Sequence, residues 1–130
     1  MNSYQEYKDY FARKQGFGVL STVGKDGRID SAVYAAPLVF DEGLAFIMSD
    51  RLSHSQVAEN PAALFLFKED GNAYEGKRLS LRAIREESDD ARIERLLRES
   101  YPERAGAYAG SKKYLVFFQV EHARPLIGEK

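Results

Sequence analysis

The stretch that decides the fold is FGVLSTVGKDGRIDSAVYAAPLVFDEGLAFIM, which occupies residues 17–48. It holds three runs of β-forming residues, at 17–23, 29–40 and 44–48. The turn-forming sequences GKDG and DEG separate these runs. Short turns join neighbouring antiparallel strands, so the stretch predicts a β-meander. Pro37 cannot donate to a ladder, so we expect a bend or an edge position at this residue.

The pattern changes at SDRLSHSQVAENP, residues 49–61. Ser53 and Gln56 have the spacing of a capping box, and the closing Asn-Pro stops a helix, so a short helix is predicted between strands. The next run, AALFLF at 62–67, is continuously apolar and predicts a strand buried on both faces. KRLSLRAIR at 77–85 alternates with period two, which predicts a strand with its leucines on the buried face and its arginines in solvent.

Two further helices are predicted from caps and apolar stripes, one with Ser3 ahead of Tyr4, Tyr7 and Phe11, and one with Ser88 ahead of Ile93, Leu96 and Leu97. Residues 114–120 (YLVFFQV) form the last predicted strand. Six mostly sequential, antiparallel strands can bury an apolar side only by curling into a small barrel or sandwich. We therefore predict a mainly β fold with three short flanking helices. Residues 1–130 show no repeat or linker, which indicates a single domain.

Composition narrows the class of protein. The formal net charge is −1, whereas a nucleic-acid binder usually carries a clear basic excess. The chain has no cysteine, which excludes disulfides, thiolate catalysis and cysteine-ligated metals. It has only two histidines, so we do not expect a His-rich metal site. No stretch approaches the run of about twenty apolar residues that spans a bilayer, and the polar N-terminal segment does not match a signal peptide. We expect a cytoplasmic protein that binds neither nucleic acid nor membrane.

The segment Ser49 to Gln56 carries most of the chemical information. It follows a strand and opens a helix, where free backbone N–H groups and the helix dipole favour an anion. Its side chains add a guanidinium, three hydroxyls and an imidazole, from Arg51, Ser49, Ser53, Ser55 and His54. Arginine and hydroxyl groups are suited to a phosphomonoester. A simple helix cap, with Arg51 and His54 in solvent, explains the same residues, so the local pattern leaves both interpretations open.

The residues from GVLSTVGKDG through FIMSDRLSHSQVAENPAALFLF resemble the pyridoxamine 5'-phosphate oxidase-like family of FMN-binding split β-barrels, over roughly residues 16 to 121. The resemblance is most specific in the first hairpin and in residues 49–61. It implies a six-stranded antiparallel split β-barrel that works as a homodimer, with FMN at the interface. The flavin phosphate is then held just after the third strand, the ring lies along the second strand, and the partner's middle strands close the pocket.

Carried over by position, the resemblance implies one set of residues that binds the flavin ring and another set that binds its phosphate. The ring lies beside Ser31, Ala32, Val33, Tyr34 and Ala35, and the phosphate is bound by Ser49, Arg51, Ser53, His54, Ser55 and Gln56. Lys77 and Arg78 match the region that reaches the flavin from the second subunit. Charge on a solvated edge strand explains these two residues equally well.

The sequence departs from the family at two places. Ser53 or His54 stands at the place of the lysine that is often found among the family's phosphate ligands. The affinity for the phosphate is therefore expected to depend more on Arg51. The tryptophan and the basic C-terminal cluster of the vitamin B6 phosphate oxidases are absent, which argues against that activity. His122 stands at the end of the last predicted strand, where it fits a surface or interface histidine better than a haem ligand.

The chain shows no nucleophile–base–orienter set and no pair of carboxylates placed for acid–base work, so no catalytic residue is assigned. The resemblance implies an FMN-dependent oxidoreductase with a small-molecule redox partner, in which the flavin supplies the redox chemistry. Two alternatives stay open. One is a non-catalytic flavin-binding or electron-transfer protein, and the other is a haem-binding split barrel.

Overall fold

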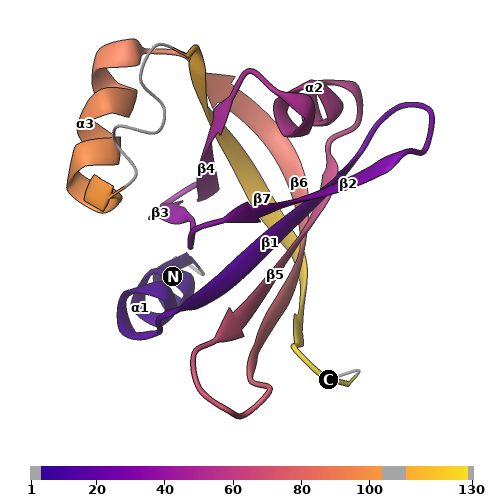
Figure 1. The fold of residues 1–130 in the computed structure, drawn as a ribbon, viewed down its shortest axis with the longest axis vertical. Coiled ribbons are helices and arrows are strands. Elements are labelled where there is room, and N and C mark those ends of the chain that lie inside the picture. The colour runs from indigo at the N-terminus through magenta and orange to yellow at the C-terminus, as the bar shows by residue number, and fades with distance from the viewer. Residues whose placement is uncertain (1–3, 104–110, 129–130) are drawn as a thin grey trace.

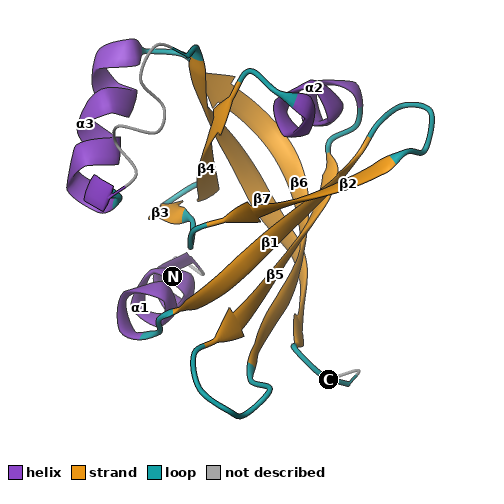
Figure 2. Cartoon of the chain, in the orientation of Figure 1, coloured by secondary structure: helices purple, strands orange, loops and turns teal. Residues whose placement is uncertain are grey.

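Figure 1 shows the fold in a computed structural model, which describes residues 4–103 and 111–128. The helices are α1 (Tyr4–Arg13), α2 (Leu52–Glu59) and α3 (Asp90–Ser100). The strands are β1 (Gly16–Val23), β2 (Ile29–Tyr34), β3 (Leu38–Phe40), β4 (Gly43–Ser49), β5 (Ala62–Glu69), β6 (Gly76–Glu87) and β7 (Lys113–Pro125). This order confirms the predicted mainly β fold with three helices (Figure 2).

Pro37 accounts for the one difference in strand count. The predicted run 29–40 is divided into β2 and β3, so the described residues form seven strands instead of six. Residues 35–37 leave the ladder because proline has no N–H to donate and restricts the residue before it. The Tyr101 hydroxyl donates to the Ala36 carbonyl at 2.6 Å and so holds the bend against the end of α3.

The seven strands form one antiparallel sheet in the order β2-β1-β5-β6-β7-β4-β3. Its two edge strands, β2 and β3, are consecutive in the chain but are not paired with each other. The sheet therefore curls until its edges approach and stops short of closure. Register shifts in the long β6–β7 pair, after Ser80 and after Ala83, allow this curvature. The result is a split barrel.

Two apolar clusters stabilise the two faces of the curled sheet. The barrel interior is largely aromatic, and the Phe46 ring lies 5.0 Å from Phe65 and 5.8 Å from Phe118. The second cluster lies under α3, where Ile93 and Leu97 are buried and Leu96 is half-buried, as the stripe predicted. No helix in the described part of the chain is long and apolar enough to cross a membrane.

Two local predictions are wrong and one cannot be judged. Strand β5 is not buried on both faces, because Phe65 and Phe67 point into the barrel while Leu64 and Leu66 on the outer face are only half-buried. Helix α3 is capped by Asp89, whose carboxylate accepts from the Arg92 N–H at 3.2 Å, and not by Ser88. A Ser88 cap would begin the helix one residue too early. The predicted Ser3 cap lies outside the described residues.

Removing the side chain of Ile93 tests how α3 is held. Ile93→Ala is expected to lower the free energy of unfolding by about 2–4 kcal/mol, because it removes a fully buried side chain and leaves a cavity. The matched control is Arg95→Ala on the exposed face of α3, which should change stability by less than about 0.5 kcal/mol. Urea unfolding measures both, and an equal effect of the two variants would contradict the packing described.

A hydrogen bond between α1 and β5 should make stability depend on pH. The Tyr10 hydroxyl donates to Glu69 Oε2 at 2.6 Å, and this bond is the main cause of the lowered pKa of the Glu69 carboxyl. Burial and the same bond raise the pKa of Tyr10. Because the folded pKa of Glu69 lies below its unfolded value, the stabilisation is complete above about pH 4.5 and is lost as the pH falls through the folded pKa.

Tyr10→Phe keeps the ring that packs against Lys77 at 4.6 Å and removes only the bond to Glu69. The variant should be less stable than the parent by about 1 kcal/mol at pH 7, and the difference should shrink at pH 3. It should also shrink above pH 10, where the unfolded tyrosine ionises. Urea unfolding at these three pH values measures the difference. A gap that stays constant with pH would show that the bond is not coupled to ionisation.

Candidate functional site

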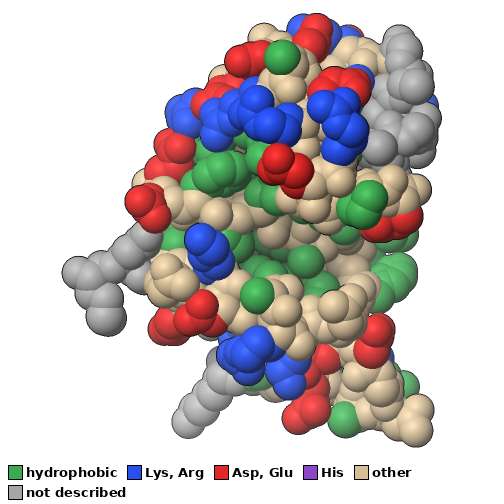
Figure 3. Space-filling model, turned by 90° about the vertical axis from the view of Figure 1, so that its left-hand side faces the viewer, with side chains coloured by type: hydrophobic (Ala, Val, Ile, Leu, Met, Phe, Trp, Pro, Cys, Tyr) green, Lys and Arg blue, Asp and Glu red, His purple; other side chains and the backbone are tan. Residues whose placement is uncertain are grey.

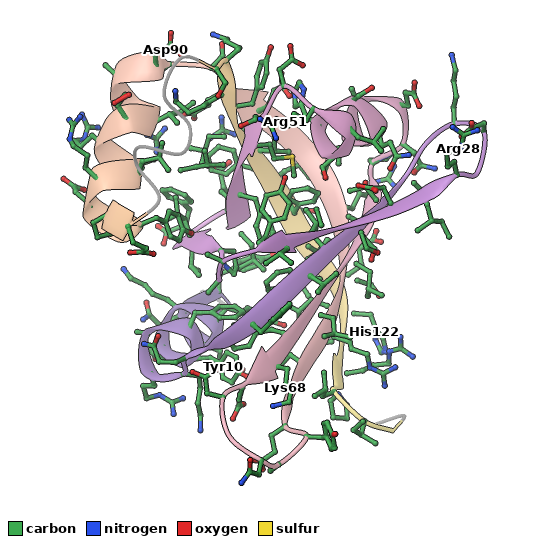
Figure 4. The ribbon with its side chains drawn as sticks, viewed as in Figure 1. Tyr10, Arg28, Arg51, Lys68, Asp90 and His122 are labelled. Carbon is green, nitrogen blue, oxygen red and sulfur yellow. The ribbon has the colours of Figure 1, made fainter. Side chains whose placement is uncertain are left out.

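A hollow of about 340 Å³ lies where the barrel is split, between the free edge of β2 and the start of α2. Its lining residues are Asp30, Ala32, Val33, Tyr34, Ile47, Ser49, Arg51, Leu52 and Ser53. The fold positions these groups because β4 ends at Ser49 and the chain turns directly into α2. In Figure 4, Arg51 marks this junction at the end of β4. The hollow thus joins the two segments to which the sequence assigns the flavin ring and phosphate.

The start of α2 has the form of an anion site. Arg51 occupies the N-cap position without a side-chain cap, and the first helical hydrogen bond runs from the Ser55 N–H to the Arg51 carbonyl at 3.0 Å. The N–H groups ahead of Ser55 therefore have no acceptor within the helix. The predicted capping box of Ser53 and Gln56 is wrong, because the helix begins two residues earlier than that cap requires. Neither side chain therefore caps the helix.

The polar lining of the hollow combines Ser49, Arg51 and Ser53. Ser53 is only 7% exposed, whereas the Arg51 side chain is exposed and has no ion-pair partner among the described residues. Asp30 contributes a carboxylate to the same hollow. A guanidinium, two hydroxyls and a helix N-terminus can bind a phosphate group, and Arg51 is the one cation among the lining residues.

His54 lies on another side of α2. Its ring stacks on Tyr114 with the ring centres 3.8 Å apart and the planes 8° from parallel. Nε2 lies 2.8 Å from Glu86 Oε1, and Nδ1 lies 3.7 Å from Asp50 Oδ1. The imidazole is not among the groups that line the hollow. It therefore fastens α2 to β6 and β7 through Glu86 and Tyr114.

Gln56 fastens the opposite side of α2. It is 4% exposed, its carbonyl accepts from the Thr22 hydroxyl at 2.8 Å, and its amide donates to the Arg28 carbonyl at 3.2 Å. These contacts tie α2 to the β1–β2 hairpin. Ser55 is exposed on the remaining face of the helix and does not line the hollow. Of the segment predicted to hold the phosphate, Ser49, Arg51 and Ser53 are therefore brought together.

The β2 residues predicted to lie beside a flavin ring point to two sides. Ala32 and Tyr34 face inward, whereas Ser31 and Val33 face outward, and the Ser31 hydroxyl lies 2.8 Å from the hydroxyl of Ser21. Ala32, Val33 and Tyr34 line the hollow and Ser31 does not. Val33 is 57% exposed at the edge of the sheet. A ligand along this strand would meet the backbone and the small side chains first.

A second hollow, of about 410 Å³, continues the first along β2, because Val33 and Tyr34 line both. It runs through the bend to the end of α1 and the end of α3, and its other lining residues are Phe11, Lys14, Gln15, Gly16, Phe17, Gly18, Ala35, Ala36, Phe67, Ser100, Tyr101 and Glu103. Figure 3 shows hydrophobic side chains gathered on the face that carries α1 and α3. Sequence reasoning missed these walls, since α1 and α3 bear only core stripes and no local motif.

Lys77 and Arg78 do not reach either hollow within one chain. Lys77 lies on the inner side of β6, with its ammonium 4.6 Å from the Tyr10 ring centre. Arg78 lies on the outer side, where Nε donates to the Pro125 carbonyl at 2.9 Å and the guanidinium also contacts the Gly128 carbonyl. His122 is exposed near the far end of β7 from α2 (Figure 4).

The fold is shared with structures of low sequence identity. HutZ, the haem storage protein of Vibrio cholerae, superposes with a TM-score of 0.68 and 19% identity over 95% of this chain and 94% of that one. An FMN-binding protein of Syntrophomonas wolfei superposes with a TM-score of 0.67 and 15% identity over 98% of this chain and 88% of that one. A Listeria innocua protein whose name assigns it to the pyridoxamine 5'-phosphate oxidases superposes with a TM-score of 0.66 and 18% identity over 95% of this chain and 97% of that one.

These structures define the class of fold as the pyridoxamine 5'-phosphate oxidase-like split β-barrel, which confirms the fold that the resemblance in the sequence implies. The fold is one that both flavin-binding and haem-binding proteins use. No protein-family model and no curated protein sequence matches the chain.

The role of His54 as an anchor can be tested without any ligand. His54→Ala removes the stack on Tyr114 and the hydrogen bond to Glu86, so the amides of α2 should exchange about tenfold faster or more, since each contact is worth about 1 kcal/mol. Ser55→Ala on the exposed face of the same helix is the matched control and should leave exchange nearly unchanged. Hydrogen exchange measured by NMR reads out both. Unchanged protection in His54→Ala would refute the anchor.

Proposed function

We propose that the chain binds FMN and acts as an FMN-dependent oxidoreductase, with the flavin phosphate in the hollow at the start of α2. The observation that carries this proposal is the convergence of an uncapped helix N-terminus with Arg51, Ser49 and Ser53 in one hollow. All of these groups can donate hydrogen bonds or carry positive charge, and all of them lie at the same hollow. Asp30 weakens the positive potential, which makes the guanidinium of Arg51 the decisive phosphate contact.

The ring would lie along β2 and enter the second hollow. Ala32, Ala35 and Ala36 are small enough for backbone atoms to approach a planar ring closely. Residues 35–37 lie outside the ladder, so their backbone groups are not used by a neighbouring strand. When bound, FMN supplies hydride or electron transfer. The residues of this chain bind the phosphate, orient the ring and leave the aromatic walls of the second hollow for a small-molecule redox partner.

The proposal includes a homodimer. The outer face of the sheet exposes Val33 and Ile29, and a second copy on that face would cover them and shield the ring from water. Of the two residues predicted to reach the flavin from a second subunit, only Arg78 points outward, since Lys77 faces Tyr10. A cytoplasmic location stays a prediction of the sequence.

One absorbance spectrum of the purified protein tests the cofactor. Flavin bands, or quenching of added FMN fluorescence, support the proposal, whereas a Soret band supports the haem-binding alternative suggested by the fold of HutZ. Absence of both signals contradicts the proposal. Steady-state turnover with NAD(P)H then separates an oxidoreductase from a flavin carrier, because a carrier shows no direct turnover.

Comparing FMN with riboflavin tests the phosphate contact, because only FMN carries the phosphate. Arg51→Ala should weaken FMN binding about tenfold to a hundredfold, the range for a lost charge-assisted hydrogen bond, and should leave riboflavin affinity nearly unchanged. Fluorescence titration gives both affinities. Arg28→Ala, an exposed arginine on the first hairpin, is the control and should affect neither ligand. An equal loss for both ligands would move the phosphate site elsewhere.

A further inference from the structure

The hollow at the start of α2 contains two opposite charges that do not pair with each other. Asp30 and Arg51 both line it, and although both belong to the described part of the chain, no ion pair joins them. Asp30 lies on the inner face of β2, opposite the buried Thr22 of β1, and is half-buried. Arg51 is exposed. A ligand in the hollow therefore meets a cation and a separate carboxylate.

The described residues supply no donor to the carboxylate of Asp30. No hydrogen bond or ion pair engages it within that part of the chain. Donors on the neighbouring elements are used elsewhere, because the Thr22 hydroxyl donates to Gln56 at 2.8 Å and the Gln56 amide donates to the Arg28 carbonyl at 3.2 Å. A carboxylate can only accept hydrogen bonds. A ligand that displaces the water around it binds well only if it supplies donors in exchange.

We propose that Asp30 makes this hollow specific for a phosphate ester that carries hydroxyl groups on the adjoining chain, with Arg51 at the phosphate and Asp30 at the hydroxyls. The inference rests on the proposed function and adds to it the residue that selects the ligand. The ribityl chain of FMN offers hydroxyls next to its phosphate. A hydroxyl that donates to a carboxylate makes a stronger hydrogen bond than one between two neutral groups.

The charges around Asp30 favour a neutral donor over an ammonium group. In a hollow of about 340 Å³, an ammonium paired with Asp30 would lie close to the guanidinium of Arg51 and to the N-terminus of α2, both of which are positive. A hydroxyl donates without this repulsion. The carboxylate also repels every further negative charge, so it disfavours inorganic phosphate and pyrophosphate. The hollow thus discriminates between a polyol phosphate and a bare anion.

Three flavins separate the contact of Asp30 from that of Arg51. Riboflavin lacks the phosphate, and lumiflavin lacks the whole ribityl chain. Asp30→Ala should weaken riboflavin binding about tenfold or more, the range for a lost hydrogen bond to a charged group, and should leave lumiflavin binding unchanged. FMN should lose less affinity than riboflavin, because the variant also removes a charge that repels the phosphate. This order is the reverse of the one expected for Arg51→Ala.

Inorganic phosphate, measured as a competitor of FMN, gives a readout of opposite sign. It should bind about threefold to tenfold more tightly to Asp30→Ala and to Asp30→Asn, since both remove the repelling charge. Asp30→Asn keeps an acceptor oxygen and should retain part of the riboflavin affinity. The control is Asp70→Ala, which removes an exposed carboxylate from the loop between β5 and β6 and should change neither affinity.

Stability separates this selecting role from a structural one. Because Asp30 has no partner among the described residues, Asp30→Ala should leave the midpoint of urea unfolding unchanged. Unchanged riboflavin affinity in the folded variant, or an equal loss for riboflavin and lumiflavin, would overturn the role of Asp30. Weaker binding of inorganic phosphate to both variants would do the same. Asp30→Asn, which keeps the shape of the side chain, carries the test if Asp30→Ala does not fold.

A titration without flavin keeps this inference separable from the proposed function. Sorbitol 6-phosphate offers hydroxyls and a phosphate without a ring, and NMR should show that the parent prefers it to inorganic phosphate whereas Asp30→Ala does not. This result in a protein that binds no flavin would contradict the proposed function and leave the role of Asp30 standing. Bound flavin without that preference would overturn the role of Asp30 alone. Failure to bind any of these ligands would overturn both.

Discussion

The buried hydrogen bond between Thr22 and Gln56 positions α2, whose N-terminus opens the proposed site. It joins the inner face of β1 to α2 at 2.8 Å, and the same amide reaches the Arg28 carbonyl in the hairpin. Helix α2 has no side-chain cap and only eight residues, so it depends on such tertiary contacts for its position. With His54 fastened to Tyr114 and Glu86 on the other side, the helix is held from two directions. Its N-terminus consequently points at the gap between the sheet edges.

That gap exists because the sheet cannot close. Pro37 interrupts the run between β2 and β3, so the two edge strands are joined by a bend and present free edges to each other. An exposed sheet edge is a hazard for aggregation unless something covers it. Here the start of α2 lies at one end of the opening. At the other end, the Tyr101 hydroxyl donates to the bend between β2 and β3. The opening that a closed barrel would lack leaves the hollow in which we propose that the ligand binds.

Much of this fold follows from the sequence, because the signals are local. The hairpin turns, the alternation at 77–85 and the stripe of Ile93 and Leu97 each depend on residues close together in the chain. A bend or an edge position was expected at Pro37, but the sequence did not show that residues 35–37 would leave the ladder and divide the run into two strands. The Asp89 cap was missed because it lies one residue after the predicted cap. The half-exposed outer face of β5 was missed for a different reason. A continuous apolar run indicates burial, but it does not show how much of each face the neighbouring elements cover.

The site was harder to predict because residue type does not reveal helix phase. Serine, histidine and glutamine all suit a phosphate, yet successive residues of a helix point about 100° apart. In α2 this rotation gives Ser53 to the hollow, His54 to Tyr114, Ser55 to solvent and Gln56 to Thr22. The polar groups that do not line the hollow are the ones that hold it in place. A substitution at His54 or Gln56 would therefore act on the proposed phosphate site by moving the helix, whereas one at Arg51, Ser49 or Ser53 would act by removing a group that lines the hollow.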